Sequence, residues 1–536
     1  MQPIRIKMSF RRFLLVLLRI ALVRKRRQFE RELSHPEIYQ TRLLKKLLKK
    51  SASSSYGKLK KINQNWNFRE FSSELPVIQY EDIEPYLDQL SPDPILFYEK
   101  TSGSSGRTKK IPYPKTLQES FHTMFLLWLH DLICLPSLQL RTLKIFMSVS
   151  PPPLSQNPET FHNVKIGSED DTNYLNPIWA KLISRFLIIP PDIKRLKIGE
   201  NFIFALSVIL ASEAELEVIS IWNPSLFFLV LETLTKHSAE IITVMKQREV
   251  IRERIRFSLI PLSESRVRAL MSQDWKAFWP ELKLISCWGE AHARAGCVRL
   301  QTEFPHAFVQ AKGLLATEAP LTLPWKKANG FIPLPSEVFY EFIPIERDTQ
   351  APPEICRLHE LKLHEEYDLV ISQKGGLLRY AMGDRIRVNG FYLGTPILSF
   401  IGRSDAVVDL VGEKLNENFV SECLDQILGT HGFRAVLPML KDFDGKSRYY
   451  LVMDQGSVQV AESIDHLFCE AYHYGIARKL GQLGELKGLV VPHAEKKILA
   501  YWQSEGMKMG NIKPSTLVRS VKHAQEILSI LKAKVN

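Results

Sequence analysis

The segment best suited to chemistry is residues 101–110, TSGSSGRTKK, which follows a stretch expected to form an apolar strand. Its two glycines allow tight backbone angles, and its hydroxyl and backbone N–H groups can surround phosphate oxygens. Its cations, Lys109 among them, can neutralise phosphate charge. The spacing is not the GxxxxGK(S/T) of a Walker A loop. The segment is therefore either a phosphate-binding loop of another kind or a surface turn or linker.

Two shorter motifs follow along the chain. Residues 313–318, GLLATE, place Thr317 beside Glu318, a pair that can contact a phosphate oxygen and hold Mg²⁺. Residues 376–384, GLLRYAMGD, contain Tyr380, which can stack on adenine, and Asp384, which can accept hydrogen bonds from ribose hydroxyls. Taken singly, these segments are equally compatible with a polar loop and with a hairpin that carries a solvated carboxylate.

A fourth motif, GRSD, occupies residues 402–405. Arg403 can contact a ribose or a phosphate, and Asp405 can act as a hinge residue that absorbs a backbone rotation. By itself this motif could equally be an ordinary polar turn.

In this order, the four motifs resemble those of the adenylate-forming superfamily, which includes firefly luciferase, acyl-CoA synthetases and the adenylation domains of peptide synthetases. Within it, the chain most resembles the auxin-responsive acyl-acid amido synthetase family of plants and bacteria. TSGSSGRTKKIP is similar to that family's phosphate loop, LLATE to its Thr/Ser-Glu motif, and RYAMGD to its YRVGD motif. GRSD is similar to the hinge motif of the superfamily. The likeness extends to HPEIYQTRLLKKLL and LPVIQYEDIEPYL nearer the N-terminus.

The resemblance implies a role for each motif residue. The ATP-binding residues would be Ser102, Gly103, Ser104, Ser105, Gly106, Thr317, Tyr380, Asp384 and Arg403. The loop serines and Lys109 would hold the β- and γ-phosphates, Thr317 would contact the α-phosphate, and Glu318 would hold Mg²⁺. Asp405 would be the hinge. A C-terminal lysine, either Lys513 or Lys508, would move over the α-phosphate, and Lys513 is the better candidate.

Two residues depart from the superfamily pattern. Leu314 stands where most members carry an aromatic residue, four positions before the motif glutamate. An apolar side chain there can still pack against adenine. Thr108 stands in the loop at a position where proline is common.

The implied reaction joins a carboxylic acid to ATP as an acyl-adenylate and then passes the acyl group to an amine. Mg²⁺ and lysine ammonium groups would offset the repulsion between the carboxylate and the phosphates. The resemblance favours an amino acid as acceptor. Two alternatives stay open: a ligase that makes a CoA thioester by the same first step, and an inactive protein of the membrane surface that keeps the fold.

The motifs require a scaffold, and alternating helical and extended patterns indicate a mixed α/β (α+β) fold. A chain of 536 residues is too long for one core. We therefore expect a large N-terminal adenylation domain over residues 1–401 and a small, mobile C-terminal α+β cap over residues 402–536. The expected helices include 37–50, 118–135 and 463–480, and the expected strands include 282–289, 336–344, 367–373 and 397–402.

The net charge of +13 is concentrated in one segment. Residues 1–61 contain 18 Lys/Arg and 3 Asp/Glu, which leaves a net charge of −2 for the rest of the chain. No basic patch interleaved with aromatic residues recurs, so no nucleic-acid partner is expected. The apolar run of residues 13–23 is shorter than the about 20 residues of a membrane span. It is expected either to dock on the protein body or to lie, through residues 1–30, on an anionic membrane surface.

The six cysteines include no CxxC pair and no zinc-ligand spacing with histidine. They are expected to be reduced thiols of a cytoplasmic enzyme.

Overall fold

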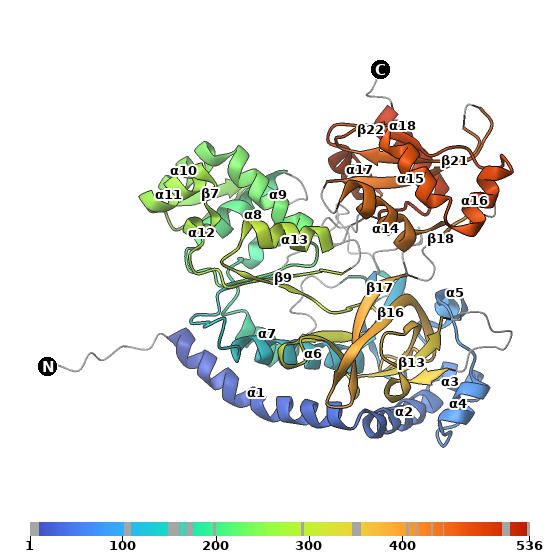
Figure 1. Cartoon of the computed structure of the whole chain (residues 1–536). Helices are drawn as coiled ribbons and strands as arrows, with labels where there is room; N and C mark the ends of the chain where they lie inside the picture. Colours follow the sequence, from blue (N-terminus) through green and yellow to red (C-terminus); the bar gives the residue numbers. More distant parts are fainter. Residues whose placement is uncertain are drawn as a thin grey trace.

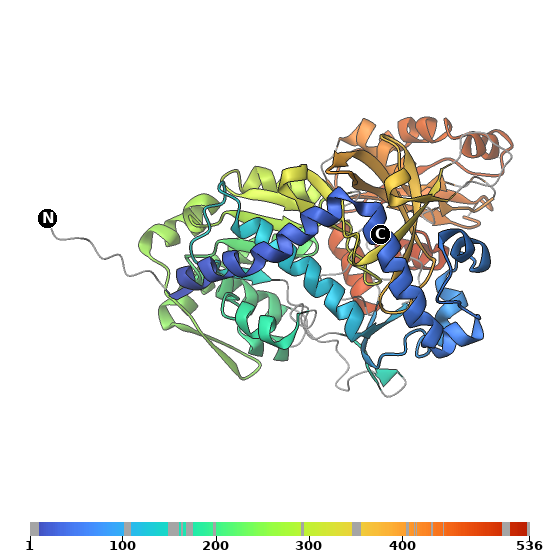
Figure 2. The same cartoon turned by 90° about the horizontal axis from the view of Figure 1, so that it is seen from below.

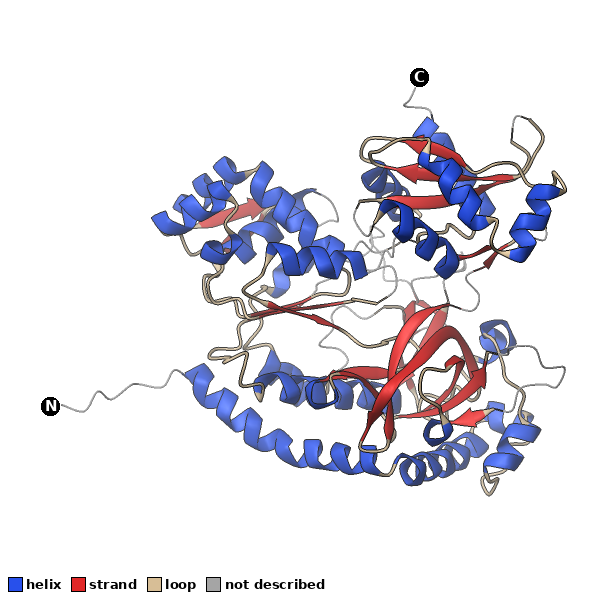
Figure 3. Cartoon of the chain, viewed as in Figure 1, coloured by secondary structure: helices blue, strands red, loops and turns tan. Residues whose placement is uncertain are grey.

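The structure is a computed structural model, and it has the mixed α/β fold that the sequence predicts (Figure 1, Figure 3). It describes residues 10–100, 109–147, 160–161, 164–167, 175–196, 200–290, 294–345, 355–403, 407–411, 413, 415–429, 432–442, 444–505, 507 and 515–532.

Helix α1 (Phe10–Ser34) lies along the protein body beside α6 (Lys115–Ile133), as Figure 2 shows. Its Leu18 and Leu22 are buried in the same hydrophobic cluster as α6. Arg19 Nε donates a hydrogen bond of 2.7 Å to the carbonyl oxygen of Ile133, where the last carbonyls of α6 lack partners within the helix. The apolar run near the N-terminus therefore docks on the body. No helix among the described residues is long and apolar enough to cross a membrane.

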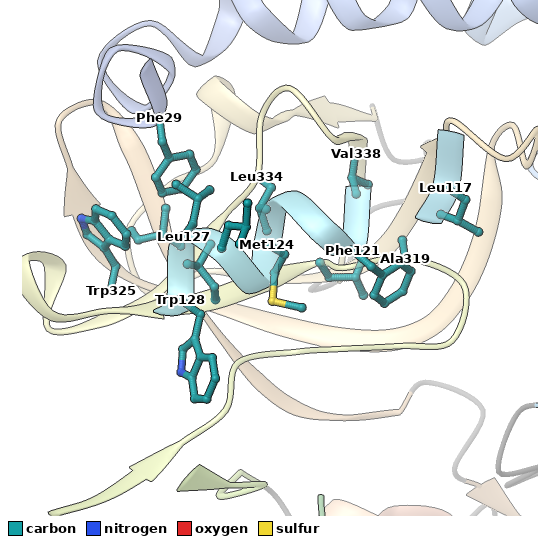
Figure 4. Packing of buried hydrophobic residues seen from close by; sticks show 14 of the residues in the cluster. Phe29, Leu117, Phe121, Met124, Leu127, Trp128, Ala319, Trp325, Leu334 and Val338 are labelled. Carbon is teal, nitrogen blue, oxygen red and sulfur yellow. The ribbon is translucent and has the colours of Figure 1, made fainter. Parts of the chain in front are cut away.

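Helix α6 follows an antiparallel strand pair. β1 (Ile95–Lys100) pairs with β2 (Lys110–Pro114), so these strands flank the glycine-serine segment, and α6 begins directly after β2. Most of the helix forms ordinary core: Figure 4 shows Phe121 and Met124 among residues of other elements. In the same view, Trp128 points to the opposite side of α6 from Phe29.

A four-stranded parallel sheet lies on that side, in the order β10–β9–β6–β3. Its strands are β3 (Ile145–Met147), β6 (Val218–Ser220), β9 (Leu284–Cys287) and β10 (Phe308–Ala311). Successive side chains alternate between its two faces. Val218 and Leu284 pack in the cluster that contains α6, whereas Ile219 and Ile285 pack in the cluster of α8 (Glu200–Ser212) and α9 (Pro224–Lys236).

The second sheet carries two of the motifs. Its strands are antiparallel in the order β14–β13–β15–β16–β17. They are β13 (Val338–Pro344), β14 (Cys356–Arg357), β15 (Glu366–Gln373), β16 (Tyr380–Tyr392) and β17 (Thr395–Arg403). Helix α2 (Pro36–Ser53) is fixed on β13 by the buried Gln40, which donates to the Val338 carbonyl at 2.7 Å and accepts from Tyr340 N at 2.9 Å.

The C-terminal part has its own three-stranded sheet, β20 (Arg434–Met439), β21 (Arg448–Met453) and β22 (Lys487–Val490). One face packs against α14 (Glu417–Leu428), α15 (Val460–Phe468) and α16 (Tyr472–Lys479), and the other against α17 (Ala494–Ser504) and α18 (Val521–Lys532). The buried residues of these two clusters all lie between Val408 and Leu531. The domain division at residues 401/402 stays a prediction.

The remaining helices and strands complete the fold. They are α3 (Ser55–Leu59), α4 (Phe68–Glu74), α5 (Tyr80–Ile83), β4 (Thr160–Phe161), β5 (Val164–Lys165), α7 (Pro177–Ile183), α10 (Ser238–Gln247), β7 (Glu249–Arg252), β8 (Ile255–Ser258), α11 (Glu264–Ser272), α12 (Trp275–Phe278), α13 (Arg294–Glu303), β11 (Thr322–Trp325), β12 (Gly330–Pro333), β18 (Val407–Val408) and β19 (Leu415–Asn416). Of these, α10, α11 and α12 add buried residues to the cluster of α8 and α9.

The predicted helices 37–50 and 118–135 and the four predicted strands are confirmed within a few residues. The single helix predicted over 463–480 is wrong, because the chain turns between α15 and α16. Asp465 accepts hydrogen bonds from Tyr474 Oη at 2.6 Å and from Arg478 at 2.7 Å, which folds α16 back towards α15. Periodicity cannot show this turn, since both segments are amphipathic.

Candidate active site

Strand β16 carries two motif residues. Tyr380 and Asp384 lie on the two flanks of a bulge in β16, both are buried, and both lie close enough to Glu318 to interact with its charge. Asp384 lies opposite Arg403 of β17 in the strand register, and Arg403 Nη1 is 3.4 Å from Asp384 Oδ1. Arg403 Nη2 also donates to the Met382 carbonyl at 3.1 Å. The pairing of β16 with β17 thus joins two of the four motifs.

Lys109 reaches this site from the residue before β2. Its Nζ donates to Tyr380 Oη at 3.4 Å and lies 5.9 Å from the centre of the Tyr380 ring. The Tyr80 ring, at the start of α5, lies 5.6 Å from the same atom. Lys110 N donates to Tyr80 Oη at 2.9 Å, which fixes the tyrosine beside β2. The ammonium group is therefore held between two tyrosine rings, an arrangement that attracts a cation.

The loop between β10 and β11 contributes Thr317 and Glu318. The loop folds back on itself, because Leu314 N donates to Thr322 Oγ1 at 2.7 Å and Thr322 N donates to the Leu314 carbonyl at 2.9 Å. Tyr113 of β2 donates its hydroxyl to the Thr317 carbonyl. Leu314, at the position of the expected aromatic residue, packs against the main core.

Four charged groups from four segments meet here. The pKa of Glu318 is raised by burial and by the neighbouring carboxylate of Asp384, while Lys109 and Arg403 lower it in part. Burial, followed by the charge of Glu318, raises the pKa of Tyr380. Because like charges repel strongly in a buried site, the two carboxylates need the two cations close by.

This donor set fits a magnesium ion. A hard divalent cation lowers the repulsion between buried carboxylates. Mg²⁺ in such sites is usually bound by one or two carboxylates together with substrate phosphates. Within the described part of the chain, no group of three or more His, Cys, Asp or Glu could hold a metal ion.

The structure brings together Lys109, Glu318, Tyr380, Asp384 and Arg403, with Thr317 beside them. The other predicted site residues lie outside the described residues: Ser102, Gly103, Ser104, Ser105, Gly106, Asp405, Lys508 and Lys513.

Gly402, which opens the hinge motif, has a positive φ of 145°. A Cβ built there would stand 2.1 Å from Asn418 Oδ1, at the start of α14. Only glycine fits this close approach of β17 to the C-terminal part.

A buried ion pair behind Tyr380 was not predicted from the sequence. Arg379 and Glu341 are almost wholly inaccessible, and Arg379 Nη2 lies 3.0 Å from Glu341 Oε1. Arg379 Nη1 also donates to the Ser72 and Leu75 carbonyls. The pair thus anchors the first residues of β16 to the N-terminal helical region. The feature of the sequence that could have indicated this buried pair is the arginine within the otherwise apolar RYAM run.

Glu290 was also missed. It follows β9 and its carboxylate accepts a hydrogen bond of 3.2 Å from Phe400 N of β17. Burial raises the pKa of Glu290 to about 7. The hydrogen bonds that it accepts from Phe400 N and from the Ser399 hydroxyl lower this pKa in part. The residue therefore ties the carboxyl edge of the parallel sheet to the strand that carries Arg403. Its signal in the sequence was a glutamate directly after a buried strand and a glycine.

Comparison with known proteins shows which family the chain resembles over most of its length. The model of the GH3 family N-terminal domain matches residues 25–307, and that of the GH3 family central domain matches residues 331–403. The chain is 27% identical over 217 residues to a putative indole-3-acetic acid-amido synthetase of Arabidopsis thaliana, covering 35% of this chain and 36% of that protein. It is 27% identical over 194 residues to a jasmonoyl–L-amino acid synthetase of Nicotiana attenuata, covering 34% and 33%.

The matched region spans about a third of the length of these curated relatives. The structural match covers more of the chain than these sequence matches do. A solved acyl acid amido synthetase, AtGH3.15 in complex with 2,4-DB, superposes with a TM-score of 0.77 at 19% identity, covering 99% of this chain and 97% of that one.

Proposed function

Because this chain belongs to the GH3 family, we propose that it is an ATP-dependent acyl-acid amido synthetase. It would activate a carboxylic acid as an acyl-adenylate and transfer the acyl group to the amine of an amino acid. One observation carries the proposal: Lys109, Glu318 and the Asp384–Arg403 pair come from distant segments into one cluster, in which both carboxylates are buried. A protein that kept only the fold would have no need of charges that are costly to bury.

Each residue of the cluster has a task in the first half-reaction. The acid's carboxylate oxygen attacks the α-phosphorus of ATP, and pyrophosphate leaves. Both reactants are anionic, so Lys109 would hold the phosphates and lower the repulsion. Glu318 would hold Mg²⁺, whose charge serves the same purpose. Asp384 would accept hydrogen bonds from the ribose hydroxyls, with Arg403 orienting its carboxylate at 3.4 Å.

In the second half-reaction, an amine displaces AMP from the acyl-adenylate, forms the amide and loses its proton. A rotation at Asp405 would withdraw Lys513, or Lys508, and admit the amine. One relative is named a putative indole-3-acetic acid-amido synthetase and another a jasmonoyl–L-amino acid synthetase, which supports an amino acid rather than CoA as acceptor.

Acid-dependent exchange of pyrophosphate into ATP tests the activation step. Folded protein should catalyse exchange with at least one acid of an aryl, fatty and jasmonate-like panel. Lys109→Met should lower kcat/KM by about a hundredfold, because it removes a cation aligned with the developing charge. Lys115→Met, at the exposed first residue of α6, is the matched control and should change it little. Absence of exchange with every acid would refute the activation step.

Product analysis then identifies the acceptor. Mass spectrometry of reactions supplied with amino acids or with CoA should show the amide and no thioester. A thioester as sole product would replace the proposal with the acyl-CoA ligase.

The location of the protein, cytoplasmic with residues 1–30 touching a membrane surface, is a separate proposal. It is supported by the side of α1 that faces away from the body, where Phe13, Leu17 and Ile20 are exposed within a basic segment. Ile20→Glu should reduce sedimentation with anionic phosphatidylserine vesicles, whereas Ile178→Glu, at an even more exposed isoleucine of α7, should not. Equal sedimentation of wild type and Ile20→Glu would rule the contact out.

A further inference from the structure

A lysine surrounded by tryptophans stands at the carboxyl edge of the parallel sheet. Lys312 follows β10, and its backbone N–H continues the ladder by donating to the Cys287 carbonyl at 2.8 Å. Its Nζ donates to Ser220 Oγ, the last residue of β6, at 2.8 Å. In parallel α/β sheets, ligands bind outside the carboxyl ends of the strands. The cluster therefore occupies the position where such a sheet binds its substrate.

Two tryptophans leave the sheet at the same edge. Trp222 follows β6 and Trp288 follows β9, and Trp288 N donates to the Trp222 carbonyl at 2.8 Å. Their ring centres are 5.9 Å apart. Lys312 Nζ lies 5.5 Å from the Trp222 ring centre. All three residues are partly exposed, so they are not sealed inside the core.

The third tryptophan is buried and fixed by hydrogen bonds. Trp128 of α6 lies 5.0 Å from Lys312 Nζ, and its indole N–H donates to Gln310 Oε1 at 3.0 Å. Ser286 Oγ donates to the same oxygen at 3.4 Å. This orientation agrees with Figure 4, where Trp128 points out of the α6 core. Side chains of the sheet thus position both the ring and the lysine beside it.

The cluster is connected to the adenylation centre by a short stretch of chain. Lys312 is five residues before Thr317, so their Cα atoms are at most about 17 Å apart. An acid whose carboxylate meets the α-phosphate near Thr317 would extend from there towards the carboxyl edge of the parallel sheet. Its far end would then meet the indole rings and the ammonium group. Aromatic walls favour a planar body, and a lysine ammonium favours an anionic group.

From this placement we infer that the acid activated by this protein is a planar, aromatic acid with a second negatively charged group, which Lys312 binds. Trp222 and Trp288 contact the ring. Lys312 is then a specificity-determining residue, and it takes no part in the chemical step. The inference rests on the proposed function, since it names the acid that the adenylation site would activate.

A matched pair of acids tests it: 3-phenylpropanoate and 3-(4-carboxyphenyl)propanoate, which differ only in the distal carboxylate. In pyrophosphate exchange, the wild type should favour the diacid in kcat/KM by about 10- to 100-fold, the range of one charge-assisted hydrogen bond. Lys312→Met should abolish that preference and leave the monoacid almost unchanged, whereas Lys312→Arg should retain it. Lys283→Met, at the amino end of the same sheet, is the matched control and should also retain it.

The ratio between the two acids separates specificity from a structural role. If Lys312→Met lowers both acids equally, or neither, the inference is overturned, as it is if the wild type prefers the monoacid. Quenching of tryptophan fluorescence by the diacid without ATP gives a second measurement. One further outcome separates this binding site from the proposed function. If quenching is saturable and is abolished by Lys312→Met, but no acid supports pyrophosphate exchange, the proposed function is refuted and the binding site is retained.

Discussion

Replacement of Glu290 by glutamine should make the stability of the protein less dependent on pH. The carboxyl group has an ordinary pKa of 4.5 and, in the folded protein, one of about 7, chiefly because it is buried. Between these values the folded state binds more protons than the unfolded state, so the free energy of unfolding falls as pH rises through this window. Glutamine keeps an acceptor for Phe400 N but does not titrate.

The expected size of the effect follows from the two pKa values. A change in the pKa of Glu290 from 4.5 to about 7 corresponds to about 3 kcal/mol in the free energy of unfolding. Wild type loses this free energy as the pH rises from the lower value past the higher one. Glu290→Gln should therefore match wild type near pH 4.5 and exceed its free energy of unfolding by about 3 kcal/mol at pH 8. The exposed Glu264→Gln, in the first turn of α11, is the control and should show no such divergence.

Urea unfolding followed by tryptophan fluorescence, at half-unit steps from pH 4.5 to 8, measures the difference. Eight of the nine tryptophans precede residue 330, so the signal reports mainly on the part of the chain that contains Glu290. A difference between Glu290→Gln and wild type that stays constant across this range would refute the reasoning, because it would mean that the carboxyl group does not titrate there.

Three further results are expected. Glu341→Gln should lower the free energy of unfolding by about 3–5 kcal/mol, since it leaves the Arg379 charge buried without its partner; a loss below about 1 kcal/mol in urea unfolding would contradict this. Gly402→Ala should lower the melting temperature more than Gly429→Ala, because both have positive φ but only Gly402 meets a side chain; equal losses by calorimetry would count against the close approach. Asp384→Asn should raise the KM for ATP by about 10- to 100-fold in pyrophosphate exchange, as charged hydrogen bonds to ribose are weakened. An unchanged KM would place the ribose elsewhere.

The sequence predicted local elements wherever apolar periodicity is unbroken. Residues 37–50 and 118–135 carry an apolar stripe of helical spacing, and both form helices. The motif order was also sufficient to identify the family, because glycine, hydroxyl and charged residues at fixed spacing reflect backbone and charge requirements that few sequences meet.

Periodicity could not reveal where two amphipathic segments turn against each other, so the break between α15 and α16 was missed. It also left open what α1 covers. An apolar stripe beside arginines suits both a membrane surface and a protein body, and only the burial of Leu18 and Leu22 beside α6 shows that one side of the helix covers the body.

The tertiary structure alone decided which charges meet. Arg379 and Glu341 are 38 residues apart and pair only because β13, β15 and β16 align. Lys312, Trp222 and Trp128 come together only at the edge of a sheet whose strands are far apart in the chain. Local spacing encodes backbone form and loop chemistry, whereas contacts between distant segments depend on how the sheets and helices pack. The four motifs could therefore be read in the sequence, and the partners that hold them in place could not.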